Sequence, residues 1–309
     1  MSLTDQSWDH CLFLVYINDL PSVISYTLSN KNSSFVLFAD DTSVIISKPC
    51  LMNFERKLNI VFQITKERFN SNFLSLNFDK TYYMQFITKN KLLNKINIEH
   101  DDKIILQTNF VNFLSITVDN IHSWKQHIDK ITPNKACYII RRSKLYLSND
   151  ALKMVYYAFF HSVMSYGLIF WGNSSHSKCV VKLQKRAIRI IMGATNNVSS
   201  TEFFKLLKIL PLSAQYIHSL LKLVVNNRNL YLDNAELYTI KTRNSYNLHP
   251  PLSHLTKYQV HYVGISVFSH LPTSIKSIAN ETKIFKKTLK RFLLDTSYYS
   301  MDEYFNFKK

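Results

Sequence analysis

Cysteine is scarce in this sequence of 309 residues. The four cysteines, at positions 11, 50, 137 and 179, lie far apart, and their spacing fits no zinc-binding pattern. We also expect no secretory signal, because residues 1–10 are polar and contain no apolar segment. These features favour a reducing intracellular compartment, either the nucleus or the cytoplasm.

Acidic residues are few as well. The chain has 21 Asp and Glu against 38 Lys and Arg, which gives a formal net charge of +17 and a pI near 9.6. A basic excess of this size indicates a polyanionic partner, most often nucleic acid, with an anionic membrane surface as the alternative. Hydrophobic residues make up 46% of the chain, which is enough for a sizeable core and argues against global disorder.

Only one stretch is apolar enough to be tested as a membrane span. Residues 154–171 contain no acidic or basic side chain apart from His161. A length of roughly 18 residues lies at the lower limit for a spanning helix. Because His161, Ser162, Ser165 and several tyrosines interrupt the run, insertion has little margin. We expect a buried helix of a helical region, and no stable membrane association.

The stretch 34–47, SFVLFADDTSVIIS, places two acidic residues between apolar runs. Runs of this kind around turn-forming residues predict a β-hairpin. A tight turn interrupts the alternation of side chains along a strand, so it presents Asp40 and Asp41 at one end of a sheet. Paired carboxylates suit Mg²⁺ and indicate metal-assisted phosphoryl or nucleotidyl chemistry. An ordinary Asp-rich turn is the alternative, and we interpret Asp101 and Asp102, which lack long apolar flanks, as such a plain turn.

The rest of the chain divides into a strand-rich part and a helical part. Apolar spacing predicts a helix over 53–70. Further strands are expected at 74–76, 82–87, 96–99, 103–107 and 110–118. Helices are expected at 125–147, 150–171, 180–192, 203–210, 213–226 and 284–294, and the polar stretch 233–251 is the best candidate for a linker.

The helix expected at 180–192 has a basic face. Lys182, Lys185, Arg186 and Arg189 follow helical spacing, and apolar residues occupy the other side. A basic helix face is often merely solvated. Because the whole chain is strongly basic, we favour a surface that contacts nucleic-acid phosphates.

Several segments occur in the order found in one protein family. They are FLVYINDLP at 13–21, FADDT at 38–42, LSLNFDKT at 74–81, FLSI at 113–116, SWKQHI at 123–128, Tyr166-Gly167 with Trp171-Gly172, and LQKR at 183–186. In this respect the chain resembles the C-terminal part of a reverse transcriptase from a non-long-terminal-repeat retrotransposon, most closely the jockey-type elements of animals. FADD alone is a weak signal, whereas the ordered set is specific.

The resemblance implies an α+β fold with a polymerase architecture. Residues 1–119 would form part of the palm, an antiparallel sheet with helices. Residues 120–232 would form a helical, thumb-like region, and residues 233–309 a C-terminal region with a linker and a basic amphipathic helix. The implied activity is RNA-directed DNA synthesis, by two-metal nucleotidyl transfer with Mg²⁺ or Mn²⁺. The implied partners are an RNA template and a DNA primer.

The resemblance also implies roles for individual residues around the Asp pair. Asp40 and Asp41 would hold the catalytic metal ions, and Phe38 and Ala39 would lie against the primer end. Lys80 falls where the family often has a basic residue near the leaving pyrophosphate; a plain surface lysine is the alternative.

Two further residues would act on the primer. Phe113 and Leu114 would form the primer grip, with plain strand packing as the alternative. The basic faces of the helical region would follow the template–primer backbone without reading sequence.

The chain also departs from the family pattern. The segment before Cys11 reads LTDQSWDH and lacks the glycines of the family's corresponding segment, and Ser115 replaces a glycine. The fingers and the upstream palm strand with the third carboxylate are not among these residues. We therefore expect a truncated polymerase that is inactive alone; the alternative is a non-catalytic, basic, nucleic-acid-binding remnant.

Overall fold

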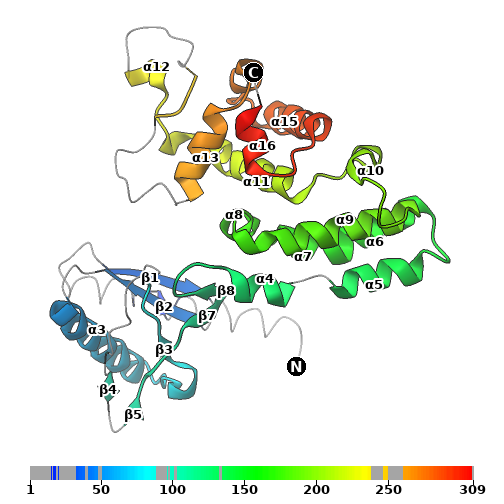
Figure 1. Cartoon of the computed structure of the whole chain (residues 1–309). Coiled ribbons are helices and arrows are strands. Elements are labelled where there is room, and N and C mark those ends of the chain that lie inside the picture. Colours follow the sequence, from blue (N-terminus) through cyan, green and yellow to red (C-terminus); the bar gives the residue numbers. More distant parts are fainter. Residues whose placement is uncertain are drawn as a thin grey trace. The chain divides into compact units, whose positions relative to one another are not determined.

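The computed structural model describes residues 15, 17–18, 20, 33–38, 41–47, 51–87, 96, 98–100, 103–131, 134–237, 246–249 and 260–307. Helices and four small two-stranded sheets make up this part of the chain, which confirms a mixed α+β class (Figure 1). The chain divides into two compact units, Met1–Phe110 and Val111–Lys309. The subdivision expected at residues 119 and 232 stays a prediction.

The first unit holds most of the strands. Its elements are β1 (Ser33–Phe38), β2 (Asp41–Ile46), α3 (Leu51–Ser71), the short 3-10 helix η1 (Phe78–Lys80), β3 (Tyr82–Tyr83), β4 (Glu99–His100), β5 (Lys103–Ile104) and β6 (Leu106–Gln107). β1 pairs antiparallel with β2 and β4 with β5, whereas β3 runs parallel to β6.

The helix α3 organises this unit because its apolar positions serve two hydrophobic clusters. Val61, Ile64 and Phe69 pack with the β1–β2 hairpin, as the helical spacing predicted. Farther toward the N-terminus of the helix, Phe54, Leu58 and Phe62 pack around the buried Ile96, Ile98 and Ile105. One amphipathic helix thus anchors both groups of strands.

Two predicted strands in this unit are wrong or too long. Residues 74–77 form no strand, because the chain there leads into η1. Of the strand expected at 82–87, only Tyr82 and Tyr83 pair with a neighbour, Leu106 and Gln107 of β6. Apolar content alone does not produce a strand where no partner strand is available.

The second unit is mainly helical. It contains the β7–β8 hairpin (Phe110–Phe113 and Ile116–Asp119, with Phe110 at the unit boundary), followed by α4 (Lys125–Ile131), α5 (Asn134–Ser143), α6 (Asn149–Tyr156), the π-helical turn η2 (Tyr157–His161), α7 (Ser162–Ser165), α8 (Leu168–Trp171), η3 (Ser175–Ser177), α9 (Lys178–Met192) and α10 (Thr201–Leu207). The C-terminal elements are α11 (Leu212–Asn226), η4 (Arg228–Leu230), α12 (Asn234–Leu237), α13 (Val260–Ser269), α14 (Thr273–Lys276), α15 (Thr282–Thr296) and α16 (Met301–Asn306).

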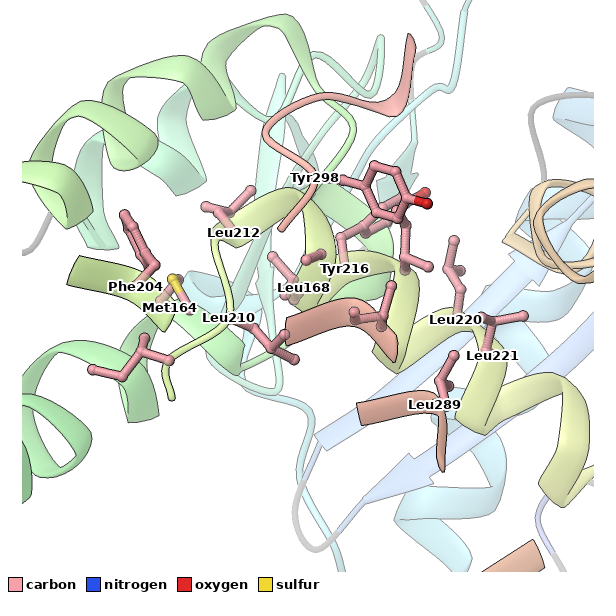
Figure 2. Packing of buried hydrophobic residues seen from close by; sticks show 14 of the residues in the cluster. Met164, Leu168, Phe204, Leu210, Leu212, Tyr216, Leu220, Leu221, Leu289 and Tyr298 are labelled. Atoms are coloured by element: carbon pink, nitrogen blue, oxygen red, sulfur yellow. The ribbon is translucent and has the colours of Figure 1, made fainter. Parts of the chain in front are cut away.

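α11 is the central helix of this unit. It contacts α8, α9, α13 and α15, and its apolar residues are buried on several sides (Figure 1). Side chains from α7, α8, α10, α11 and α15 interdigitate in one core (Figure 2). This core contains most of the buried hydrophobic residues of the described chain and so holds the second unit together.

The segment tested as a membrane span is a helix with a π-helical turn, and it ends before Gly167. α6, η2 and α7 follow one another without a break from Asn149 to Ser165, because the backbone where they meet is right-handed helical throughout. Tyr166 is extended and Gly167 has φ +60°, so α8 is a separate turn and the helix expected at 150–171 is confirmed only as far as Ser165. In the part of the chain that the structure describes, no helix is long and apolar enough to cross a membrane. Of the helix expected at 125–147, the structure shows α4 and α5, and residues 132–133 between them lie outside the described residues.

The expected linker at 233–251 lies partly outside the described residues. Its described part contains α12 and an isolated β-bridge between Asp233 and Leu248. Leu248 is buried in the core of the second unit. This part of the stretch is therefore packed rather than free.

Candidate functional site

The β1–β2 hairpin has the register that the Asp pair requires. Phe38 pairs with Asp41, so Ala39 and Asp40 form the two-residue connection between the strands. Ala39 and Asp40 themselves lie outside the described residues. Asp41 is the first residue of β2 and is exposed. The predicted hairpin is therefore confirmed at its strands, with the two acidic residues at one end.

The two faces of this hairpin differ in burial. Phe35, Leu37, Val44 and Ile46 share the face that packs against Ile17, Leu20 and Val61. Because strand side chains alternate, Phe38 and Asp41 lie on the opposite face, where Phe38 is 56% exposed. Packing thus fixes the hairpin from one side and leaves its acidic end accessible.

Asp41 is an exposed carboxylate at the start of β2, and such a group can bind a hard cation. Among the described residues, no group of three or more His, Cys, Asp or Glu side chains gathers to hold a metal ion. Mg²⁺ normally uses only one or two carboxylates, with water and substrate phosphates as its other ligands. Asp41 can supply one such carboxylate, whereas Asp40 lies outside the described residues.

The second Asp pair gives an instructive comparison. His100 pairs with Lys103, so Asp101 and Asp102 also connect two antiparallel strands through two residues, and both lie outside the described part. The antiparallel pairing of the flanking strands agrees with the interpretation as a turn. Although its apolar flanks are short, Ile98 and Ile105 in these flanks are buried, at 2% and 5% exposed.

Lys80 ends a small, self-contained turn in the first unit. The Asn77 side chain accepts a hydrogen bond of 3.3 Å from the Lys80 amide, and Thr81 Oγ1 donates one of 2.7 Å to the Asn77 carbonyl. The Lys80 residue is exposed. Asn77 and Thr81 of this motif therefore stabilise the turn itself, and the Lys80 side chain is not needed for packing.

The residues expected to grip the primer lie in the second unit. Phe113 ends β7, and Leu114 and Ser115 form the turn to β8 with φ of +47° and +63°. This turn corrects the single strand expected at 110–118. The Leu114 carbonyl accepts a 2.6 Å hydrogen bond from the Tyr166 hydroxyl, and a Cβ on Gly167 would lie only 2.7 Å from Ile116 Cδ1.

A Ser115→Gly substitution should stabilise this hairpin. Left-handed backbone costs an L-residue roughly 1–2 kcal/mol, and glycine removes this cost. Glycine also raises the conformational entropy of the unfolded chain, which lowers the stability by about 0.5–1 kcal/mol. We therefore expect a net gain of about 0.5–1 kcal/mol, or a Tm about 2 °C higher, in thermal unfolding. The matched Ser162→Gly variant, at φ −57°, should be less stable than the parent chain. A Ser115→Gly chain that melts below the parent would contradict the strain argument.

The segment that follows β8 is organised by Asp119, which the sequence analysis missed. Its two carboxylate oxygens accept hydrogen bonds of 2.7 Å and 2.8 Å from the amides of Ser123 and Trp124. Burial would raise the pKa of Asp119, but these hydrogen bonds outweigh it and hold the pKa below its ordinary value. An acidic residue shortly before a Ser-Trp pair was the available signal.

The aromatic and glycine residues of the helical motifs also have structural roles. Trp171 Nε1 donates a 3.0 Å hydrogen bond to the Tyr166 carbonyl, and the Trp124 ring stacks on Phe170. A Cβ on Gly172 would lie 2.5 Å from Tyr216 Cδ2. The conspicuous motif residues of this unit therefore hold the β7–β8 hairpin, α4 and α8 together.

The predicted basic face of α9 divides into two pairs. Lys182 and Arg186 are exposed. Lys185 Nζ instead lies 4.8 Å from the centre of the Tyr299 ring, and Arg189 Nε donates a 2.8 Å hydrogen bond to the Val198 carbonyl. Half of the face thus makes intramolecular contacts, and the other half points to solvent.

The site residues predicted from sequence are shared between the two compact units. Asp41, Phe38 and Lys80 belong to the first unit, whereas the hairpin residues Phe113 and Leu114 and the α9 face belong to the second. No family model, no curated protein and no solved structure matches this chain. The family resemblance therefore rests on the order and content of the sequence motifs.

Proposed function

We propose that this chain is part of an RNA-directed DNA polymerase of a jockey-type retrotransposon. The observation that supports it most is the β1–β2 hairpin, whose acidic end is accessible while its other face is packed. Under this proposal β1, β2 and α3 belong to a partial palm, and the helices after β8 form the thumb-like region. The partners are an RNA template and a DNA primer, and these residues alone bind them without extending the primer.

The proposed metal ligands are Asp40 and Asp41, with Mg²⁺ or Mn²⁺ as the ion. When bound, the ion would neutralise negative charge on the reacting phosphates. Phe38 and Ala39 would position the primer end beside the carboxylates, and Phe113 and Leu114 would hold the primer backbone. Lys80, exposed at the end of η1, would act on the leaving pyrophosphate.

The second candidate function is a non-catalytic, basic, nucleic-acid-binding remnant. The observation that favours it is the exposed pair Lys182 and Arg186 on α9, in a chain with a net charge of +17. Such a surface binds phosphates without any metal site. The two candidates therefore differ in whether Asp40 and Asp41 bind a divalent cation.

An Asp40→Asn/Asp41→Asn variant should bind Mn²⁺ at least about tenfold more weakly than the parent chain in the presence of primer–template, since both carboxylate ligands are lost. Electron paramagnetic resonance measures the free Mn²⁺, and the bound Mn²⁺ is the difference from the total. The matched control is Asp101→Asn/Asp102→Asn, which removes the same charge next to another pair of antiparallel strands. The control should keep the parent affinity.

Equal losses in the two variants would mean that the ion only follows general negative charge, and the polymerase proposal would fail. Unchanged Mn²⁺ binding in the first variant, with primer–template binding retained, would favour the non-catalytic remnant.

A further inference from the structure

Three elements of the second unit contribute five basic side chains that interact electrostatically with one another. α11 contributes His218 and Lys222, α15, which packs against α11, contributes Lys286 and Lys290, and η2 contributes His161. The two residues from α11 are four positions apart, as are the two from α15, so each pair shares one face of its helix. We call these five residues the cationic cluster.

Apolar packing, rather than attraction between the charges, brings the cluster together. Phe285, Leu289 and Leu293 of α15 are fully buried, and Leu289 belongs to the same core as Leu221 of the neighbouring helix α11 (Figure 2). Lys286 and Lys290 each directly follow one of these buried residues, and Lys222 follows Leu221. The contact between the two helices thus sets the lysines at its rim.

The cluster groups lower one another's pKa values. Burial lowers the pKa of His218 to about 4, and Lys222, Lys290 and His161 add to the effect. Burial also lowers the pKa of Lys222, together with Lys286 and Lys290. For His161, burial and Lys290 lower the pKa against a hydrogen bond with the Gln215 side chain. Within the described residues, every charged group behind these shifts is cationic, so a bound anion would relieve the repulsion.

The Nδ1 atom of His218 is available to a ligand as a hydrogen-bonding group. His218 is 6% exposed, and its Nδ1 atom is buried without a hydrogen-bond partner. Buried polar atoms in folded proteins are nearly always paired, because an unpaired one carries an unrecovered desolvation cost. A ligand that reaches the cluster would therefore gain both a hydrogen bond and a favourable electrostatic interaction.

An accessible aromatic ring lies beside the cluster. The Tyr157 and His161 ring centres are 5.0 Å apart, and Tyr157 is 37% exposed. A positively charged groove with an aromatic ring at its side is the usual arrangement for binding single-stranded nucleic acid, in which phosphates meet the cations and bases stack on the ring.

We propose that the cationic cluster binds the phosphates of single-stranded nucleic acid, with Tyr157 stacking on a base. The site lies outside the α9 face and outside the Asp hairpin, and it shares with the proposed function only the premise that the partner is a nucleic acid.

The test compares two triple variants of the full chain. Lys222→Gln/Lys286→Gln/Lys290→Gln removes three charges from the cluster. Lys283→Gln/Lys287→Gln/Arg291→Gln removes three charges from exposed positions of the same helix α15. Affinity for a fluorescent oligothymidylate is measured by anisotropy over a range of salt concentrations.

Each lost phosphate contact reduces the salt slope for single strands by about 0.7, so the cluster variant should lose about 2 from the slope. The α15 control should keep the parent slope. Equal losses in the two variants would overturn the proposal, because only net charge would then matter.

The histidines give a readout that does not depend on how the variants fold. In the parent chain, NMR titration of the His161 and His218 rings should show higher pKa values when oligothymidylate is bound, since the bound phosphates favour the protonated rings. Affinity should accordingly rise as the pH falls. Unmoved histidine pKa values at saturating oligonucleotide would overturn the proposal.

Two other probes identify the source of the phosphate. Inorganic phosphate or anionic lipid vesicles at the same phosphate concentration should leave both histidine pKa values unmoved. If either probe reproduces the full shift, the site binds free phosphate or a membrane surface and the nucleic-acid proposal is wrong.

The proposed function has its own outcome in the same experiments. A Lys182→Gln/Arg186→Gln variant reports on the α9 face, and the Mn²⁺ measurement reports on the Asp hairpin. An unchanged salt slope in the cluster variant, with altered Mn²⁺ binding in the Asp variant, would refute the cluster site and leave the polymerase proposal standing.

Discussion

A Gln184→Leu substitution should lower the free energy of unfolding of the second unit by about 3 kcal/mol or more. Gln184 is fully buried in α9 and joins three other segments. Its amide nitrogen donates to the Tyr156 hydroxyl at 2.9 Å and to the Leu210 carbonyl at 3.0 Å, and its oxygen accepts from the Leu212 amide at 2.9 Å. Leucine would leave three buried polar groups unpaired, at about 1–3 kcal/mol each.

The position of these groups explains why no other partner can replace Gln184. Leu210 and Leu212 flank Pro211, where α10 has ended and α11 has just begun, so their backbone groups lack helical partners. Burial raises the pKa of the Tyr156 hydroxyl, which therefore stays neutral and needs a hydrogen bond. The Gln184 side chain thus provides hydrogen-bond partners for the Leu212 amide at the start of α11, the Leu210 carbonyl and the buried Tyr156 hydroxyl.

Urea unfolding followed by tryptophan fluorescence measures this loss, because Trp171 is fully buried in the same core. The control is Gln126→Leu, an exposed position of α4, which should change stability by less than about 0.5 kcal/mol. A double-mutant cycle with Tyr156→Phe should show coupling between the two side chains. Similar small effects at both glutamines would refute the network's role.

Local sequence patterns were sufficient for the features that depend on neighbours in the chain. The periodicity at 53–70 predicted α3 nearly to its ends, because that helix buries one continuous stripe. The hairpin at 34–47 was predictable because the connection at Ala39 and Asp40 is so short that it fixes the pairing of Phe38 with Asp41.

Features that depend on distant partners could not be predicted in this way. The turn at Leu114 and Ser115 has left-handed backbone without a Gly or Asn to signal it, and a hydrogen bond from Tyr166 holds it in place. Arg189 belonged to a regular basic face in the sequence, yet it bonds the Val198 carbonyl. Helical spacing identifies which residues share a face, but the fold decides which of them remain available.

The cationic cluster illustrates the same limit. His218 and Lys222 lie in a mainly apolar helix, and nothing in their spacing indicates that α15 will add Lys286 and Lys290 beside them. A basic helix at 284–294 was expected, whereas its contact with α11 follows only from the packing of Leu289 and its neighbours.

Acidification from neutral pH to about pH 4 should destabilise the second unit through His218. Burial lowers the pKa of this histidine from 6.5 to about 4, with repulsion from Lys222 and Lys290 in addition. Between these two values the unfolded chain binds a proton at this residue and the folded chain does not. Through this residue, the free energy of unfolding is therefore highest above pH 6.5. It falls by about 3 kcal/mol as the pH drops toward 4.

Urea unfolding at several pH values measures this loss, and a His218→Leu variant isolates it. Leucine carries no titrating group, so the variant's stability should fall less steeply between pH 6.5 and 4 than that of the parent chain. Part of the pH dependence should remain, because burial and Lys130 also lower the pKa of His127. The affinity of the variant for oligothymidylate should also rise less steeply than that of the parent chain as the pH falls. Identical stability profiles for the two chains would show that folding does not lower the pKa of His218, and the electrostatic account of the cluster would then be wrong.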